Sequence, residues 1–142
     1  MLPRTTHTPI PLPALLTLIV FMLPALSSVA AAETRSGDQV YQQVCAGCHA
    51  SGVANAPRYG AQEDWEELIE EGQEVLTAHG WVGIRGMPPR GGRPDLPLEQ
   101  FAAAVAYMAR SAGADWQAPD PAMLAGIREE ITARKSELAA KK

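Results

Sequence analysis

The sequence predicts a helical protein, and three features of the chain favour this fold class. Apolar residues recur every three or four positions in residues 61–79 and 98–112, which is the spacing of one face of an α-helix. A third stretch begins at Asp120-Pro121, an N-cap residue followed by proline at the first helical position. Stretches rich in glycine and proline lie between these segments, so we expect irregular loops to join the helices.

The N-terminal segment, Met1–Ala32, is predicted to be a secretory signal peptide that is cleaved after Ala32. It has one basic side chain, Arg4, then an apolar run over residues 14–23 and small residues before the cut. An uncleaved membrane anchor is the alternative. The apolar run is shorter than the ~20 residues that span a bilayer, and prolines flank it, so we favour cleavage.

The charge of the chain excludes one class of function. The 142 residues carry 12 basic and 16 acidic side chains, and loss of Arg4 with the signal leaves a net charge of −5. Nucleic-acid binding needs basic patches, so we expect no nucleic-acid partner. The acidic balance suits a soluble protein that meets partners through their positive patches.

The motif Cys45-Ala46-Gly47-Cys48-His49 follows a first predicted helix over Asp38–Cys45. Cys-x-x-Cys-His is the attachment signature of c-type haem. Residues three and four apart are neighbours on a helical turn, so both thiols and the imidazole can face one object. The motif predicts a covalent haem c, with Cys45 and Cys48 bonded to the haem vinyls and His49 bound to the iron.

Two other uses of the cysteine pair were weighed against haem. A thioredoxin-like dithiol needs a βαβ context, and a zinc site needs two further well-spaced ligands. The sequence offers neither, so haem attachment is strongly favoured.

The stretch Ala61–His79 is predicted as one helix, with Trp65, Leu68 and Gly72 on its apolar face. The opposite face carries a run of acids without a basic residue: Glu63, Asp64, Glu66, Glu67, Glu70, Glu71 and Glu74. A charge run of this kind is usually a solvated helix face, and a docking surface for a basic partner is the alternative.

Met87 is the predicted second axial ligand of the iron. It lies in the predicted loop Gly80–Pro97, within Gly86-Met87-Pro88-Pro89-Arg90-Gly91-Gly92, where prolines stiffen the chain and glycines permit close approach to a flat ring. Its thioether is a soft, neutral ligand that favours ferrous iron. The competitors are weaker: Met108 fits an apolar helix face, and His79 ends the acidic helix.

The last two helices complete the pattern. Leu98–Ala112 is predicted to be a helix that stops at Gly113. Residues 115–142 form a helical extension to the domain at 33–114. Its apolar residues at roughly heptad spacing would let it pack on the domain, pair with another chain or stay free: Leu124, Ile127, Ile131 and Leu138.

Together these motifs resemble a small class I c-type cytochrome, and within that class the chain is similar to the cytochrome c5 family. The likeness runs from Gly37 to Ala112. Besides the cysteine motif it includes Val40-Tyr41, Ala56-Pro57, Met87-Pro88-Pro89-Arg90-Gly91-Gly92 and Ala104-Val105-Ala106-Tyr107-Met108. The methionine loop and the Tyr107 helix are the most specific of these.

The resemblance implies an all-α cytochrome c fold around one covalently attached haem, with the segment after Asp115 as an extra C-terminal helix. The first helix should cross the last domain helix near Val105 and Tyr107, with Gly37 allowing close approach. The carbonyl of Pro57 is the implied acceptor for His49 Nδ1–H, a bond that would orient the imidazole. Three arginines are candidates to neutralise the haem propionates: Arg58, Arg85 and Arg90.

The function that follows is a periplasmic monohaem cytochrome that carries single electrons and has no catalytic activity of its own. Its partners would be respiratory complexes or periplasmic reductases and oxidases, with membrane contact only transient or through a partner. One alternative is a haem-bearing electron-transfer subunit of a larger oxidoreductase, docked through 124–138. Another is a haem sensor in which a gas displaces Met87.

Overall fold

The computed structural model describes residues 34–141. The predicted signal segment, Met1–Ala32, lies outside the described residues. Within them the chain is helical without a named strand, which confirms the all-α fold class. The elements in chain order are α1 (Gly37–Val40), a π-helical turn (Tyr41–Cys45), α2 (Ala46–His49), a 3-10 turn (Val53–Asn55), α3 (Gln62–Glu70), α4 (Gln73–Val82), a 3-10 turn (Pro89–Gly92), α5 (Leu98–Ser111) and α6 (Pro121–Ala140).

The first helical segment is longer than predicted, because α1, the π-helical turn and α2 follow one another without a break from Gly37 to His49. At its start, the Ser36 backbone N–H donates to Gln39 Oε1 at 3.0 Å. The cysteine motif therefore lies on helical backbone throughout. This geometry turns Cys45, Cys48 and His49 toward a common side, as their three- and four-residue spacing requires.

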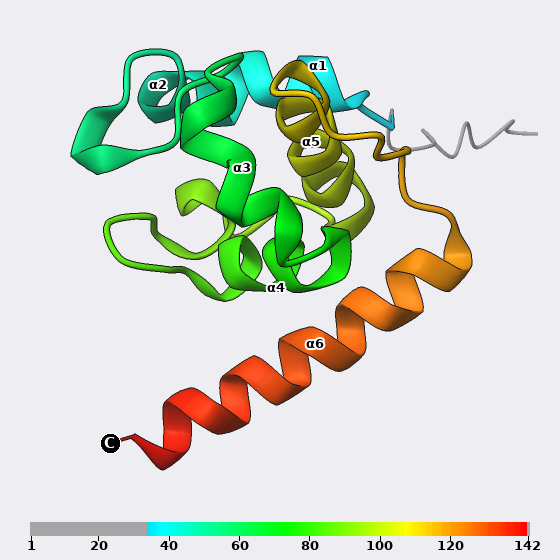
Figure 1. Cartoon of the computed structure of the whole chain (residues 1–142). Helices are drawn as coiled ribbons and strands as arrows, with labels where there is room; N and C mark the ends of the chain where they lie inside the picture. The colour runs from blue at the N-terminus through cyan, green and yellow to red at the C-terminus, as the bar shows by residue number, and fades with distance from the viewer. Residues whose placement is uncertain (1–33, 142) are drawn as a thin grey trace, which may run out of the picture. The chain divides into compact units, whose positions relative to one another are not determined.

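Helix α1 packs closely on α5, as Figure 1 shows. A Cβ built at Gly37 would overlap the Ala103 carbonyl oxygen and lie 3.1 Å from Tyr107 Cβ. Beside this crossing, the Tyr41 ring centroid lies 4.7 Å from that of Tyr59 and 5.6 Å from that of Tyr107. The absence of a side chain at Gly37 is therefore what sets the distance between the two helices.

Gly37→Ala is expected to destabilise the protein by about 1–3 kcal/mol, because the added methyl meets rigid backbone and the helices must separate. Thermal unfolding of the exported protein measures this. Gly47→Ala is the matched control: it lies in α2, and a Cβ there meets no protein atom within 4 Å. Equal losses in the two variants would contradict the packing argument.

The prediction of one helix over Ala61–His79 is wrong. The segment forms two helices, α3 and α4, which meet at Gly72 with φ +91° and ψ 155°. L-residues rarely adopt this backbone conformation, whereas glycine does so without steric cost. Gly80, predicted to start the following loop, lies instead inside α4, which ends at Val82.

Helix α5 forms the centre of the domain and confirms its prediction to within one residue. Its buried face includes Phe101, Ala104, Val105 and Met108, each less than 7% exposed. Gly113 follows with φ +105°, a backbone conformation suited to ending a helix. The core of the domain is therefore built around one well-buried helix, α5.

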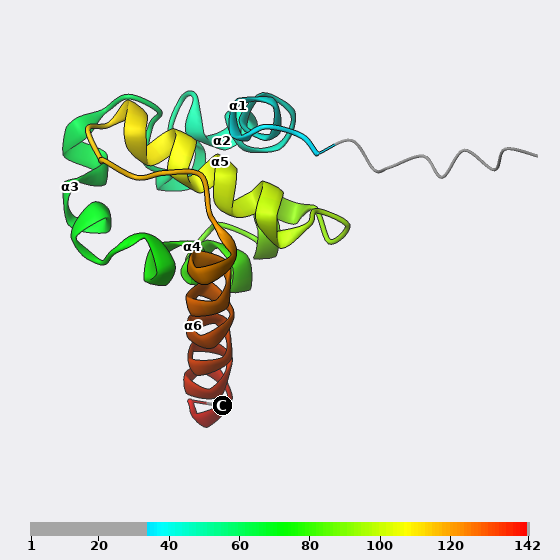
Figure 2. The same cartoon turned by 90° about the vertical axis from the view of Figure 1, so that its right-hand side faces the viewer.

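Helix α6 folds back onto the domain and lies along α4 (Figures 1 and 2). Asp120 caps it by accepting from Met123 N–H at 2.8 Å. Its residues Leu124, Ile127 and Ile131 are buried against a cluster that includes Ala78 and Ala102. This apolar face is thus covered by the chain's own domain, the first of the three arrangements considered. None of the helices among residues 34–141 is both long and apolar enough to cross a bilayer.

Candidate functional site

The two cysteine thiols are free and differ in exposure: Cys45 is buried and Cys48 is exposed. Burial, and after it the neighbouring Cys48, raises the pKa of Cys45 to about 11. A reactive dithiol depends on a lowered pKa, because the thiolate is the nucleophile. The thiol environment therefore disfavours the dithiol alternative. Among residues 34–141, no three His, Cys, Asp or Glu side chains gather as a metal site would require.

His49 is held in one orientation by the chain. Its side chain is buried, and Nδ1 lies 2.8 Å from the Pro57 carbonyl oxygen. A carbonyl only accepts hydrogen bonds, so Nδ1 is the ring nitrogen that carries a proton in this contact. Nε2 is then the nitrogen left to bind a metal, which is the arrangement that histidine ligands of metals use.

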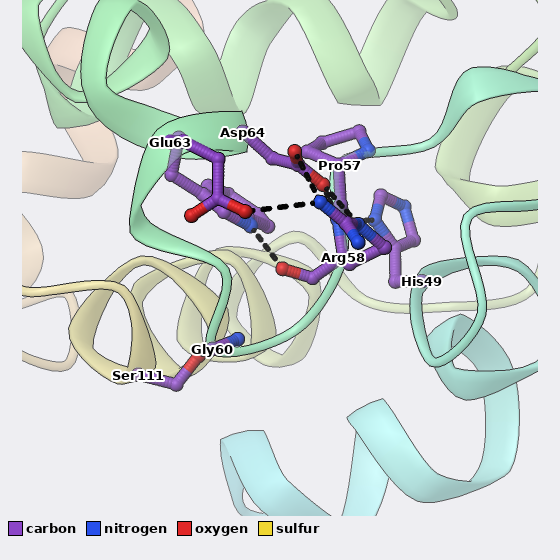
Figure 3. A network of polar contacts seen from close by, with 8 residues as sticks. His49, Pro57, Arg58, Gly60, Glu63, Asp64 and Ser111 are labelled. Atoms are coloured by element: carbon purple, nitrogen blue, oxygen red, sulfur yellow. Dashed lines mark hydrogen bonds and ion pairs between the residues drawn. The ribbon is translucent and has the colours of Figure 1, made fainter.

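The loop that supplies the Pro57 carbonyl is fixed by a network shown in Figure 3. Arg58 Nε donates to Asp64 Oδ2 at 2.7 Å, and its Nη2 donates to Glu63 Oε1 at 3.1 Å. The Trp65 indole N–H donates to the Arg58 carbonyl oxygen at 2.8 Å. The Tyr59 backbone N–H donates to the His49 carbonyl oxygen at 2.7 Å. Helix α3 thus anchors the segment that orients the imidazole.

Asp64→Asn is expected to lower the unfolding temperature at pH 7, and the difference should vanish in acid. Hydrogen bonds from the Arg58 side chain, and after them from the Arg58 backbone N–H, hold the pKa of Asp64 at about 2. A carboxyl whose pKa is lowered on folding stabilises the folded state at pH values above its ordinary pKa of about 3.9. This stabilisation is lost as the pH falls toward 2.

Thermal unfolding of wild type and variant from pH 7 to pH 2 measures this difference. The control is Glu67→Gln, which changes an exposed acid on the same helix. A difference between wild type and Asp64→Asn that stays constant over the whole pH range would rule out the ion pair as its cause.

Met87 lies in a tight turn closed by two backbone hydrogen bonds with Ile84. Met87 N–H donates to the Ile84 carbonyl at 2.9 Å, and Ile84 N–H donates to the Met87 carbonyl at 3.1 Å. The half-buried Met87 side chain packs on the domain core, and its Cε would lie 3.5 Å from a Cβ at Gly80. The closest atom to that Cβ would be Phe101 Cζ at 3.0 Å, so Gly80 leaves room on α4 chiefly for the Phe101 ring beside Met87, a role that the sequence pattern did not reveal.

The competing ligands are engaged elsewhere. Met108 is buried on α5, and Met123 packs in the cluster between α4 and α6. His79 Nδ1 lies 2.9 Å from Glu71 Oε2, across the junction of α3 and α4. Met87 is thus a thioether on a loop, whereas Met108, Met123 and His79 lie within helices and have other packing partners.

The structure distinguishes the three candidate arginines. Arg58 is occupied by Asp64 and Glu63. Arg85 is exposed at a positive φ of 53°. Arg90, three residues after Met87, is half-buried, and its guanidinium carbon lies 4.3 Å from the centroid of the Trp81 ring.

The residues present fit a haem c. Two free thiols lie on one helical turn, and an imidazole is held through Nδ1 by the Pro57 carbonyl, which leaves Nε2 to bind a metal. A thioether lies on a stiffened loop against the same core cluster as Cys45. Thiols, imidazole and thioether are the donors that c-type cytochromes use to hold haem.

Fold and motif together define a class I c-type cytochrome, the class whose members carry covalently attached haem c and transfer electrons. The family model described as "Cytochrome C oxidase, cbb3-type, subunit III" matches residues 32–108, more than half of the chain. The chain belongs to this family of c-type cytochromes and is related to cytochrome c5.

Named relatives agree with this assignment. The chain is 36% identical over 81 residues to cytochrome c-555 of Prosthecochloris aestuarii, covering 51% of this chain and 82% of the relative. It is 34% identical over 76 residues to cytochrome c5 of Azotobacter vinelandii, covering 52% of this chain and 92% of the relative.

A solved structure is similar as well. It is a chain from the crystal structure of an electron transfer complex of nitrite reductase with cytochrome c. Its TM-score is 0.52 at 42% identity, with 54% of this chain and 93% of that chain covered. The aligned share of this chain is close to that of the named relatives, so the likeness concerns about half of the sequence.

Proposed function

We propose that the protein is a periplasmic monohaem cytochrome c that carries single electrons between redox partners. Cys45 and Cys48 form the thioether bonds, His49 and Met87 bind the iron, and the Pro57 carbonyl fixes the imidazole. The observation that carries this proposal is the 2.8 Å contact between His49 Nδ1 and the Pro57 oxygen. It prepares Nε2 for a metal at the position that the cysteine motif assigns to the ligand.

The bound haem iron supplies a one-electron change between ferric and ferrous states. The chain fills both axial positions in this proposal, so it leaves no open coordination site for a substrate. A soft thioether favours the ferrous state and raises the reduction potential. These properties are those of a carrier without catalytic activity, and they disfavour a gas sensor.

The proposed location and partners follow from the sequence and the relatives. Met1–Ala32 directs export and is removed, which leaves the domain at 33–114 and the extension at 115–142. The similar chain in a complex with nitrite reductase supports redox enzymes as partners in general. Respiratory complexes and periplasmic reductases or oxidases are the proposed classes.

The visible spectrum of the protein, expressed with its signal for export, tests this function. We expect one haem per chain, a c-type α-band after reduction and a weak band at the red end when oxidised. A potentiometric titration should follow a single one-electron curve, and the reduced protein should not bind CO at neutral pH. Rapid CO binding by the wild type would favour the sensor instead.

A subunit of a larger oxidoreductase is the second candidate, favoured by the description of the matching family as an oxidase subunit. Burial of Leu124, Ile127 and Ile131 against the chain's own α4 and α5 argues against the docking route expected for it. Size-exclusion chromatography of the protein from its native membrane and soluble fractions separates the two. A monodisperse monomer supports the carrier, and stable copurification of a second polypeptide supports the subunit.

A further inference from the structure

We propose that α6 holds the methionine ligand in place, and that Ile127 acts through α4 as a positioning residue for Met87. Loss of the α6 contact would weaken the bond between the thioether and the haem iron, and would leave the cysteine and histidine part of the site intact. This inference rests on the proposed function, since it takes Met87 as an axial ligand. It gives the extension at 115–142 a role in the haem site, although the matching family model ends at residue 108.

Helix α6 packs along the outer side of α4, so that α4 lies between α6 and the rest of the domain (Figures 1 and 2). Ile127 is 0% exposed and belongs to one buried cluster with Ala78 of α4 and Ala102 of α5. The Gln73 side chain of α4 donates from Nε2 to the Gln117 carbonyl oxygen at 2.9 Å, which ties the segment before α6 to the same helix. The position of α4 therefore depends on α6.

Trp81 links the cluster under α6 to the core of the domain. Its half-buried ring packs against both buried clusters, the one that contains Ile127 and the one against which Met87 packs. The ring meets Phe101 edge-on, with centroids 5.5 Å apart, and the Arg90 guanidinium carbon lies 4.3 Å from its centroid. A shift of α4 would disturb contacts on both sides of this ring, because close-packed interiors transmit strain.

The end of α4 also sets the position of the methionine loop. The helix ends at Val82, and a Cβ built on the next residue, Gly83, would lie 3.0 Å from both N and Cδ of Pro89. The loop backbone therefore packs directly on the helix end. Between these contacts, Ile84 and Met87 exchange two backbone hydrogen bonds. The thioether is thus carried by a turn that begins at the last residues of α4.

The effect of α6 on the loop is transmitted by α4. A recess of about 330 Å³ is bordered by Lys135 of α6 and by Pro89 and Arg90 of the loop, so direct packing does not join the two segments there. When Met87 leaves the iron, the loop moves and α4 gives up part of its contact with α6. A contact favours one of two states only where it is stronger in that state. Ile127 meets this condition, because its complete burial requires α4 to stay in place.

Ile127→Ala tests the proposal in the exported holoprotein, with added imidazole as the probe. Imidazole competes with the thioether for ferric iron, and loss of the weak red band measures its binding. The truncation leaves a cavity beside α4, so imidazole should bind roughly tenfold more tightly than to wild type, a change of about 1.4 kcal/mol. Ile127→Val keeps most of the side chain and should lie between the two. Covalent haem content should be unchanged in both variants.

Val40→Ala is the matched control, because it truncates another side chain that is 0% exposed. Val40 lies in α1, on the far side of the domain from α6 (Figures 1 and 2). Thermal unfolding of each variant is measured, and the control is compared with the Ile127 variant of more similar stability. Its imidazole affinity should stay close to wild type. An equal gain in affinity at similar stability would overturn the proposal, since the effect would then reflect general destabilisation.

Hydrogen exchange of the reduced protein supplies the readout that locates the effect. The Met87 N–H, bonded to the Ile84 carbonyl, lies in the methionine loop, and the Tyr59 N–H, bonded to the His49 carbonyl, lies on the histidine side of the site. In Ile127→Ala the Met87 amide should exchange faster, and the Tyr59 amide should keep its wild-type rate. Equal acceleration of both amides, or of neither, would refute the role of α6. A wild type with bound haem but no red band would instead count against Met87 as a ligand, and so against the proposed function.

Discussion

Met87→Ala is expected to lower the midpoint potential by an amount on the order of 0.1 V or more, a sizeable part of the ~0.8 V range that axial ligands set. The thioether stabilises ferrous iron, and its loss leaves one axial position to water or a stronger donor. The weak band at the red end of the oxidised spectrum should disappear. The reduced variant should also bind CO, because the iron then has an exchangeable position.

The matched control for this change is Met108→Leu, which alters a buried methionine on α5. Volume-conserving swaps of this kind usually cost less than about 1.5 kcal/mol, so the fold should survive. We expect the control to keep its potential and its red band. A red band that persists in Met87→Ala, or that is lost in Met108→Leu, would refute the assignment of Met87.

The double change Cys45→Ala and Cys48→Ala is expected to abolish covalent haem attachment. Without thioether bonds the haem is held only by axial ligation and packing, and a small domain loses a large part of its apolar core. The mass of the purified chain should then correspond to the polypeptide alone, and little folded protein should accumulate.

Single cysteine variants supply the comparison for the double change. Cys45→Ala and Cys48→Ala each leave one thiol, so a reduced yield with haem on the remaining cysteine is the expected result. Full haem content in the double variant after denaturation in acid would show that the cysteines do not hold the cofactor.

Local patterns in the sequence predicted the helices well where packing agrees with periodicity. Asp120-Pro121 predicted the start of α6, and Gly113 the end of α5, because each residue acts on its own backbone. The prediction that joined α3 and α4 into one helix was wrong, because periodicity records which residues are apolar and not the backbone conformation that each adopts. Gly72 continues the apolar spacing, but it adopts a positive φ that the pattern does not record.

The site could be predicted at the level of donors but not of their surroundings. The Cys-x-x-Cys-His motif gives the thiols and imidazole, and the resemblance gives the Pro57 carbonyl. The hydrogen bond from Trp65 to the Arg58 carbonyl and the space that Gly80 leaves for the Phe101 ring both depend on contacts between separate segments of the chain. Such contacts follow from the packed fold, so a single sequence does not reveal them.

The extension illustrates the same limit. Apolar residues at roughly heptad spacing fit packing on the domain, pairing with another chain or a free helix equally well. The structure selects the first, since Ile127 and Ile131 face the cluster of Ala78 and Ala102. The outcome depends on residues far away in the sequence, because Ala78 of α4 and Ala102 of α5 are the buried residues that α6 packs against.

The most direct test of the central claim is proton NMR of the reduced protein with 13C-labelled methionine methyl groups. Beyond the predicted signal segment the chain holds three methionines, Met87, Met108 and Met123. A methyl group bonded through sulfur to haem iron lies over the porphyrin, and the ring current moves its signal far upfield. We predict one such signal, assigned to Met87 by its loss in Met87→Leu. No upfield methionine methyl, or one that belongs to Met108 or Met123, would contradict the account.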